Sequence, residues 1–267
     1  SGKIESDASQ WITYQGKTLK CNASYYWKVK IDTNKGATNW SAPAFWTTGL
    51  FNEADWQGQW IGLDRAAPGD SETQWSRLAA RYLRKEFAVK KSVKRATVHI
   101  AGMGLYELFI NGQRIGNQVL APAPTDYRKT ILYNTYDVTS LLQTENAIGV
   151  TLGNGRFYTM RQNYKPYKIP TFGYPKLRLN LIVEYADGSK ETIATNTSWK
   201  LTTEGPIRSN NEYDGEEYDA RKELGAWTQT GYDDKGWMQA QRVSIPSGTL
   251  RAQMMPGMKV TETLKPV

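Results

Sequence analysis

The dipeptide Asn111-Gly112 joins two short runs of strand character and commits this part of the chain to an antiparallel hairpin. The run before it, residues 105–110 (LYELFI), is rich in branched and aromatic side chains, which suit a pleated, half-buried strand. Asn-Gly readily adopts positive φ at both central positions, as a two-residue hairpin turn requires. Residues 113–116 return the chain, so the sequence predicts β-sheet here.

Runs of the same kind continue on both sides of this hairpin. In residues 175–185, every second side chain is apolar, namely Leu177, Leu179, Leu181 and Val183, which places them on one face of a strand. Further strands are expected at residues 81–89, 93–100, 130–136 and 147–152, with one helical turn after Asp137. We therefore expect an all-β fold with little helix, built around an antiparallel, jelly-roll-like β-sandwich.

The only histidine and the only cysteine both favour structural interpretations. His99 lies between Val98 and Ile100, two core candidates, so alternation predicts a surface imidazole that points outward. A lone Cys21 excludes a disulfide within the chain, and we expect a small buried thiol. One Cys and one His cannot form a zinc site unless carboxylates supply the other ligands.

The first 55 residues have the pattern of an incomplete domain. Side chains alternate along residues 24–31, with Tyr25, Trp27, Val29 and Ile31 on one face, and residues 45–49 (FWTTG) form a closing strand. Three or four strands can be counted, whereas an immunoglobulin-like sandwich needs about seven strands and ~100 residues. This region is therefore expected to be part of a sandwich.

Charge and hydropathy exclude two classes of partner. The formal net charge is +8, but lysines and arginines are scattered and no nucleic-acid-binding motif accompanies them. We therefore expect no nucleic-acid partner. No apolar run approaches the ~20 residues that cross a bilayer as a helix, so no membrane span is expected.

The segment 156–174 is long, lacks a period, and contains five Tyr or Phe rings before Gly173. Such loops are usually functional or disordered, and this aromatic content disfavours disorder. Aromatic rings can stack on sugar C–H surfaces while planar polar groups bind hydroxyls. The same rings could instead cover one end of the sandwich or dock another domain. Candidate sugar contacts are Arg156, Tyr158, Asn163, Tyr164 and Tyr167.

Five carboxylates fall within residues 210–221. A glycosidase needs two carboxyl groups about 5–9.5 Å apart, one of them kept protonated by its surroundings. A sequence cannot show that geometry, and no EF-hand spacing is present. We expect a structural role, with Asp219 and Arg221 in salt bridges.

Four motifs resemble the N-terminal β-sandwich module of bacterial α-L-rhamnosidases: YELFINGQRIG, LAPAPTDYRK, YNTYDVT and NAIGVTLGNG. The earlier pattern YYWKVKIDTNKG, followed by NWSAPAFWTTGL, is similar to the last strands of a fibronectin type III-like domain. The resemblance implies three parts: the end of that domain (1–55), the rhamnosidase sandwich (56–245) and a linker toward a catalytic domain (246–267).

This resemblance implies an accessory fragment of a glycoside hydrolase that acts on L-rhamnose-containing glycans. The parent polypeptide would be the enzyme, whereas this fragment would be inactive, since the (α/α)6 barrel with its acid and base is expected after Val267. No catalytic residue is therefore assigned here. The implied partners are that barrel and a rhamnose-containing glycan, and the implied location is periplasmic or extracellular in a bacterium.

Two alternatives remain open. Related modules bind L-rhamnose through calcium, for which the matching positions here are Asp126, Asn154 and Asn163; no cofactor is otherwise required. Two departures weaken this reading: Arg156 stands where the family often has Trp, and residues 123–125 (APT) stand where it has Gly-Trp-Thr. The other alternative is an independent, adhesion-like β protein.

Overall fold

The computed structural model describes residues 2–8, 10–66, 78–158, 172–213 and 215–266. The chain divides into two compact units, Ser1–Phe51 and Asn52–Val267. In the described residues, helix is limited to three 3-10 turns, η1 (Glu53–Asp55), η2 (Thr139–Leu141) and η3 (Ala220–Lys222). The all-β prediction is therefore confirmed. Among the described residues, no helical segment has the length and hydropathy needed to span a bilayer.

The first unit contains two short antiparallel ribbons. β1 (Ser24–Trp27) pairs with β4 (Ala44–Thr47), and β2 (Asp32–Thr33) pairs with β3 (Gly36–Ala37). Tyr25 stacks on Trp46 across the first ribbon, with ring centroids 4.8 Å apart. Several large apolar side chains are exposed, namely Trp11, Tyr26, Trp27, Val29, Ile31, Trp40 and Phe45.

Cys21 corrects the expectation of a buried thiol. It lies in the turn before β1 and is exposed. A turn at the surface leaves its side chain in solvent, whereas the expectation rested on the usual burial of free cysteine.

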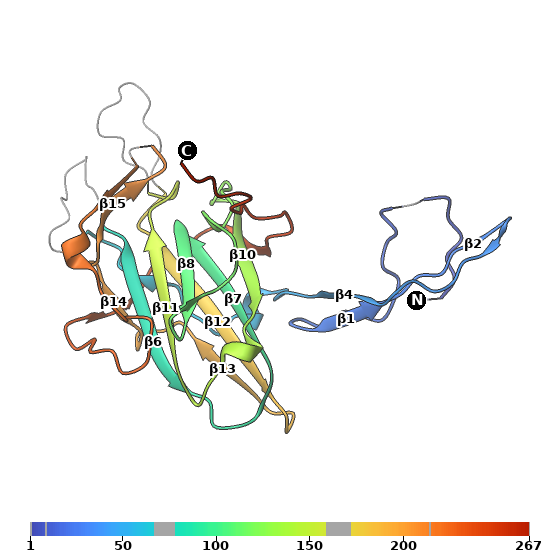
Figure 1. Cartoon of the computed structure of the whole chain (residues 1–267), viewed down its shortest axis with the longest axis horizontal. Coiled ribbons are helices and arrows are strands. Elements are labelled where there is room, and N and C mark those ends of the chain that lie inside the picture. Colours follow the sequence, from blue (N-terminus) through green and yellow to red (C-terminus); the bar gives the residue numbers. More distant parts are fainter. Residues whose placement is uncertain (1, 9, 67–77, 159–171, 214, 267) are drawn as a thin grey trace. The chain divides into compact units, whose positions relative to one another are not determined.

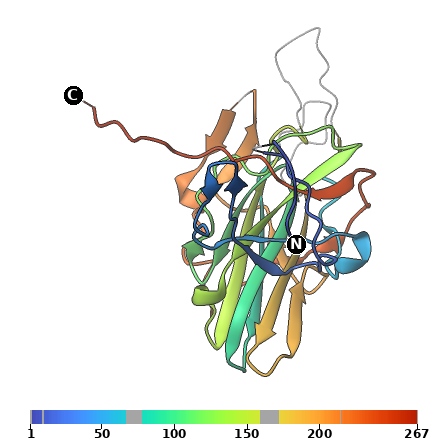
Figure 2. The same ribbon diagram turned by 90° about the vertical axis from the view of Figure 1, so that its right-hand side faces the viewer.

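The second unit is a β-sandwich of a seven-stranded and a six-stranded sheet, shown in Figures 1 and 2. The first sheet has the order β18 (Gln241–Arg242), β5 (Ile61–Gly62), β12 (Lys176–Tyr185), β7 (Val93–Met103), β10 (Thr130–Asp137), β19 (Thr249–Ala252), with β13 (Lys190–Ala194) also on β12. The second has the order β17 (Met238–Gln239), β14 (Lys200–Thr202), β6 (Arg81–Ala88), β11 (Glu145–Gly153), β8 (Leu105–Ile110), β9 (Gln113–Arg114). A separate hairpin joins β15 (Ile207–Asn211) to β16 (Gly215–Tyr218).

The apolar faces of the two sheets meet in one core. The predicted face of β12 is fully buried there, from Leu177 to Val183. It faces side chains of the other sheet such as Leu83 and Val150, while Trp199 fills the space before β14. Removal of this apolar surface from water is the main contribution to the stability of the unit.

The Asn111-Gly112 turn has the predicted geometry. Both residues have positive φ, 51° and 82°, and the register pairs Ile110 with Gln113. The Asn111 side chain also donates to Leu141 O and accepts from Ala147 N, each at 2.9 Å. The turn is therefore fixed both by its backbone and by a side chain that binds neighbouring segments.

His99 corrects a second expectation, because its imidazole is buried and not at the surface. Its ring lies 6.4 Å from that of Trp56 and 6.0 Å from that of Tyr133, and Nδ1 is 3.0 Å from Thr135 Oγ1. Burial lowers the pKa of His99 to about 4, with a smaller contribution from Arg95. The prediction from alternation was wrong here because both faces of this sheet are covered, so a side chain on the outer face is buried as well.

Residues 53–60 cover the outer face of β12. Arg178 donates to Gly58 O at 2.6 Å, forms an ion pair with Glu53, and lies 5.3 Å from the centre of the Trp56 ring. Gly58 N in turn donates to Asn180 Oδ1 at 2.8 Å. Polar residues of β12 thus remain buried because this segment satisfies their hydrogen bonds.

The C-terminal region differs from the expected extended linker. Thr249–Ala252 forms β19, which adds to β10 as a parallel strand. Further on, Lys259 bridges to Gln118, and Met258 O accepts from Val119 N at 2.9 Å. Residues 249–259 are therefore bound to the sandwich.

Candidate functional site

The candidate site lies where β11 ends. Residues 159–171 fall outside the described residues, and the predicted contacts Asn163, Tyr164 and Tyr167 fall with them. The described parts are the turn after Gly153 and the chain from Phe172 to Tyr174. Phe172 N donates to Phe157 O at 2.9 Å, so the two ends of the long loop are held together.

A compact turn at residues 154–158 places three predicted residues side by side. Asn154 O accepts from Phe157 N at 3.1 Å and from Tyr158 N at 3.2 Å. Gly155 adopts φ +49°, and a Cβ at this position would collide with Leu105. This turn therefore keeps Asn154, Arg156 and Tyr158 within one short, hydrogen-bonded segment.

Asn154 is buried and strongly held. Its backbone N donates to Asn210 Oδ1 at 2.6 Å, while Nδ2 donates to Leu78 O and Asn210 O at 2.8 and 2.9 Å. Its own Oδ1, and Asn210 Nδ2 beside it, have no hydrogen-bond partner in the described structure. A buried amide oxygen without a partner is costly, and amide oxygens are suitable ligands for calcium or hydroxyl groups.

Asp126 lies on a neighbouring loop but its charge is already compensated. Arg128 donates to Asp126 Oδ1 at 3.0 Å, and this contact lowers the pKa of the Asp126 carboxyl. No group of three or more His, Cys, Asp or Glu side chains suited to a metal occurs in the residues described. Asn154 Oδ1 thus lacks a partner whereas Asp126 has one, and the calcium site stays a prediction.

The described rings of the loop pack on one another. Phe157 packs edge-on against Tyr127 with centroids 5.2 Å apart and stacks on Phe172 at 6.1 Å. Tyr158 is only 7% exposed and stacks on Tyr174 at 5.6 Å. One face of the Tyr158 ring is therefore occupied by protein, which suits a role in anchoring the loop.

Of the two predicted sugar contacts that the structure describes, Arg156 reaches solvent. Its side chain is 47% exposed and forms a 3.1 Å ion pair with Glu212. A guanidinium and a carboxylate side by side offer both donors and acceptors to sugar hydroxyl groups. Among the described residues, this pair is an accessible polar feature that adjoins the long loop.

The predicted salt bridge between Asp219 and Arg221 is present in the acidic segment. Arg221 Nε and Asp219 Oδ1 are 2.8 Å apart, and Asp219 also accepts from Arg221 N at the start of η3. The Arg221 hydrogen bond lowers the pKa of Asp219 to about 2. A glycosidase general acid needs the opposite shift, toward neutral pH.

Sequence reasoning missed the contribution of Asn210, Glu212 and Tyr127. Asn210 anchors Asn154, Glu212 pairs with Arg156, and Tyr127 packs on Phe157. The polar run Asn210–Glu212 was visible, but its partners lie 56 residues earlier in the chain. No local pattern signals such a pairing.

Two family models match the chain. Residues 91–262 match "Alpha-L-rhamnosidase N-terminal domain", and residues 1–52 match "Rha78A-like, N-terminal immunoglobulin domain". The second match agrees with an immunoglobulin-like character for the first unit, where we expected the related fibronectin type III-like type.

The similar proteins are much longer than this chain. An α-L-rhamnosidase of Formosa agariphila is 37% identical over 100% of this chain and 30% of its own length. The structure of an α-L-rhamnosidase from Dictyoglumus thermophilum matches with TM-score 0.83 at 40% identity, over 96% of this chain and 29% of the other. The structure of an α-L-rhamnosidase from Aspergillus terreus matches with TM-score 0.82 at 36% identity, over 92% of this chain and 28% of the other. The chain thus spans less than a third of each of these three relatives.

Proposed function

Because the chain belongs to the family of α-L-rhamnosidase N-terminal domains, we propose that it serves as a non-catalytic module of a larger α-L-rhamnosidase. In this proposal it supports the region that cleaves the glycosidic bond of a rhamnose-containing glycan. We further propose a periplasmic or extracellular location, where such glycans are accessible.

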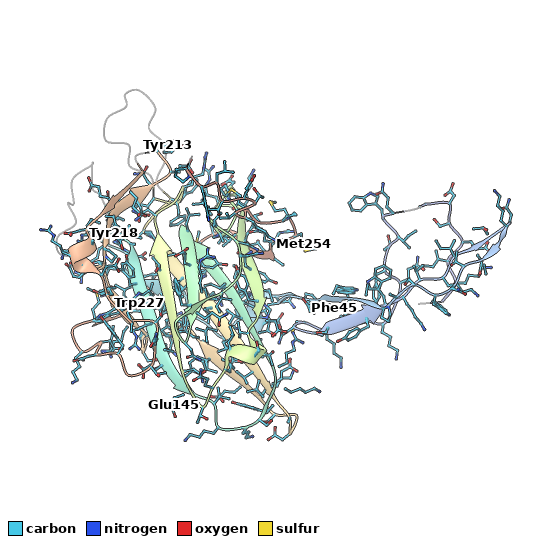
Figure 3. The ribbon with its side chains drawn as sticks, viewed as in Figure 1. Phe45, Glu145, Tyr213, Tyr218, Trp227 and Met254 are labelled. Carbon is cyan, nitrogen blue, oxygen red and sulfur yellow. The ribbon has the colours of Figure 1, made fainter. Side chains whose placement is uncertain are left out.

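An exposed apolar strip supports this proposal. It consists of Leu120, Met254, Met255, Met258 and Val260, which are between 51% and 90% exposed. Met254, labelled in Figure 3, lies on the segment that follows β19 at the edge of the sheet. Contiguous exposed apolar residues mark interaction surfaces, and methionine adapts well to a packing partner.

The strip is held in place and is not a loose tail. Met258 O accepts from Val119 N at 2.9 Å, and Gln253 N donates to Tyr133 O at 2.9 Å. Leu120 adopts φ +53°, a conformation that is costly for a residue with a Cβ. We propose that the rest of the larger polypeptide packs on this strip.

The test uses the longer polypeptide that carries this chain. The double variant Leu120→Ser, Met258→Ser should lower the melting temperature of the full-length enzyme. It should also lower the rate at which the heated enzyme hydrolyses p-nitrophenyl α-L-rhamnoside. Ile245→Ser, at another exposed apolar residue, is the matched control. The isolated chain should show no hydrolysis. A double variant as heat-stable as the control would contradict the proposal, as would activity of the isolated chain.

A second candidate function is calcium-dependent binding of L-rhamnose. The unpartnered Asn154 Oδ1 and the exposed Arg156–Glu212 pair favour it. Calorimetric titration of L-rhamnose, with calcium and then with chelator, tests this function. Binding that requires calcium and is lost in Arg156→Ala, but kept in Lys190→Ala, would support it. Absence of binding at high millimolar L-rhamnose would contradict this second function and leave the role as a supporting module as the remaining proposal.

A further inference from the structure

A polar depression lies on the flank of the sandwich, away from the residues of the candidate site at the end of β11. It is a pocket of about 530 Å³, within the range of small-molecule sites. Its lining is almost entirely charged or polar and includes Arg84, Glu86, Lys200, Asp233, Asp234 and Lys235. The neighbouring Trp227 is labelled beside β6 in Figure 3.

The alternation of β6 and β14 explains why charged side chains gather here. Leu83 and Leu201 are paired across the two strands and face the core. The next pair, Arg84 and Lys200, therefore points to the outer face of the sheet. The segment from Trp227 to Lys235 folds over this face and forms the opposite wall of the pocket.

Arg84 makes this wall rigid. Its side chain is 1% exposed and donates at 2.9 Å to the carbonyl oxygens of Trp227 and Gln229. It also forms ion pairs with Asp234 and with Glu86, the latter at 2.5 Å. Because its hydrogen bonds are used within the protein, Arg84 shapes the pocket, and its single charge is shared between two of the pocket's carboxylates.

The lining holds four basic and three acidic side chains, so its net charge is +1. Lys85, Lys200 and Lys235 line the pocket, and none has an ion pair within the part of the chain that the structure describes. Lys200 also lies directly opposite Arg84, an arrangement of like charges that destabilises a sheet. Unpaired ammonium groups in a concave site with this net positive charge attract a singly charged anion.

The carboxylates restrict the kind of anion. Asp233 is exposed at the pocket, and Glu86 and Asp234 retain oxygen lone pairs beside their ion pairs. Carboxylates repel a densely charged ligand but accept hydrogen bonds from hydroxyl groups. Ammonium and carboxylate groups together therefore suit a ligand with one negative charge and several hydroxyls.

We propose that this pocket binds an acidic saccharide, with the uronate carboxylate at Lys200 and Lys235 and the hydroxyls at Asp233 and Glu86. Half-buried Tyr232, whose ring lies 5.3 Å from the Arg84 guanidinium carbon, forms part of the wall. This site is independent of the proposed function, since it uses neither the apolar strip nor the loop residues.

The experiment is calorimetric titration of the chain at low ionic strength with sodium D-glucuronate, D-glucose and sodium sulfate. Glucuronate should bind at least tenfold more tightly than glucose or sulfate, and its affinity should fall as salt is added. The double variant Lys200→Gln, Lys235→Gln should weaken glucuronate binding at least tenfold. Lys90→Gln, an exposed lysine outside the pocket, should leave it unchanged.

Circular dichroism of each variant establishes that the fold is retained, which is expected because these side chains are partly or fully exposed. Three results would overturn the proposal: no saturation up to about 50 mM glucuronate, equal binding of glucose, or equal binding of sulfate. Equal losses in the double variant and in Lys90→Gln would also overturn it, since they would indicate a general charge effect.

Discussion

Lowering the pH from 7 to 5 should destabilise the second unit through one buried side chain, His99. Burial lowers its pKa to about 4 in the folded protein, from an ordinary value of 6.5. Between these two pKa values the unfolded chain binds more protons than the folded one. Stability therefore rises with pH across this window, and it is lost progressively as the pH falls below 6.5.

The two pKa values imply a loss of about 2 kcal/mol between pH 7 and pH 5, of which about 0.7 kcal/mol occurs by pH 6. The chain has no other histidine. Carboxyl groups contribute little in this range, because they titrate near pH 4 in unfolded chains. The pH dependence of unfolding can therefore be assigned to one residue.

The assay is urea unfolding of the chain at pH 7, 6 and 5, followed by circular dichroism. His99→Gln is the control, since glutamine does not titrate. This variant should be less stable than the wild type at pH 7 but should lose much less stability on acidification. Equal wild-type stability at pH 7 and pH 5 would refute the reasoning, and so would a His99→Gln variant with the wild-type pH dependence.

Two further predictions concern backbone geometry. Gly104→Ala should cost about 3 kcal/mol, because Gly104 adopts φ +121° and an added Cβ would collide with Gly153 O. Gly188→Ala, at φ +83° in open surroundings, should cost about 1 kcal/mol, and equal urea midpoints for the two variants would contradict this. Asn111→Ala should cost about 3 kcal/mol in thermal unfolding, and Asn111→Gly less, since glycine keeps the positive φ and loses only the side-chain bonds. Wild-type stability in both Asn111 variants would exclude this role.

Features set by neighbouring residues were predictable from the sequence. The turn at Asn111-Gly112 and the apolar face of β12 depend on backbone preference and on alternation, which are both local. The salt bridge between Asp219 and Arg221 is also local, since the two residues lie two positions apart.

Features set by distant segments were not predictable. His99 is buried because residues 53–60 cover its sheet, and Gly58 is held there by Arg178, 120 residues away. The strand β19 escaped prediction because its pairing with β10 joins residues that are far apart in the chain. At the candidate site, the role of Asn210 was not predictable for the same reason: it binds Asn154 from a strand that is distant in the sequence.

The position of β5 in its sheet has a consequence for biosynthesis. β5 lies between β12 and β18, and the nearby Asp64 carboxylate accepts from Ser244 N, 180 residues later. At 5–20 residues per second, a ribosome takes about 10–40 s to make that interval. During this time the first strand has no partner from β18, so the sheet closes only after nearly the whole unit has been translated. A chaperone that shields residues 56–63 (WQGQWIGL) as they emerge should therefore raise the yield of folded protein.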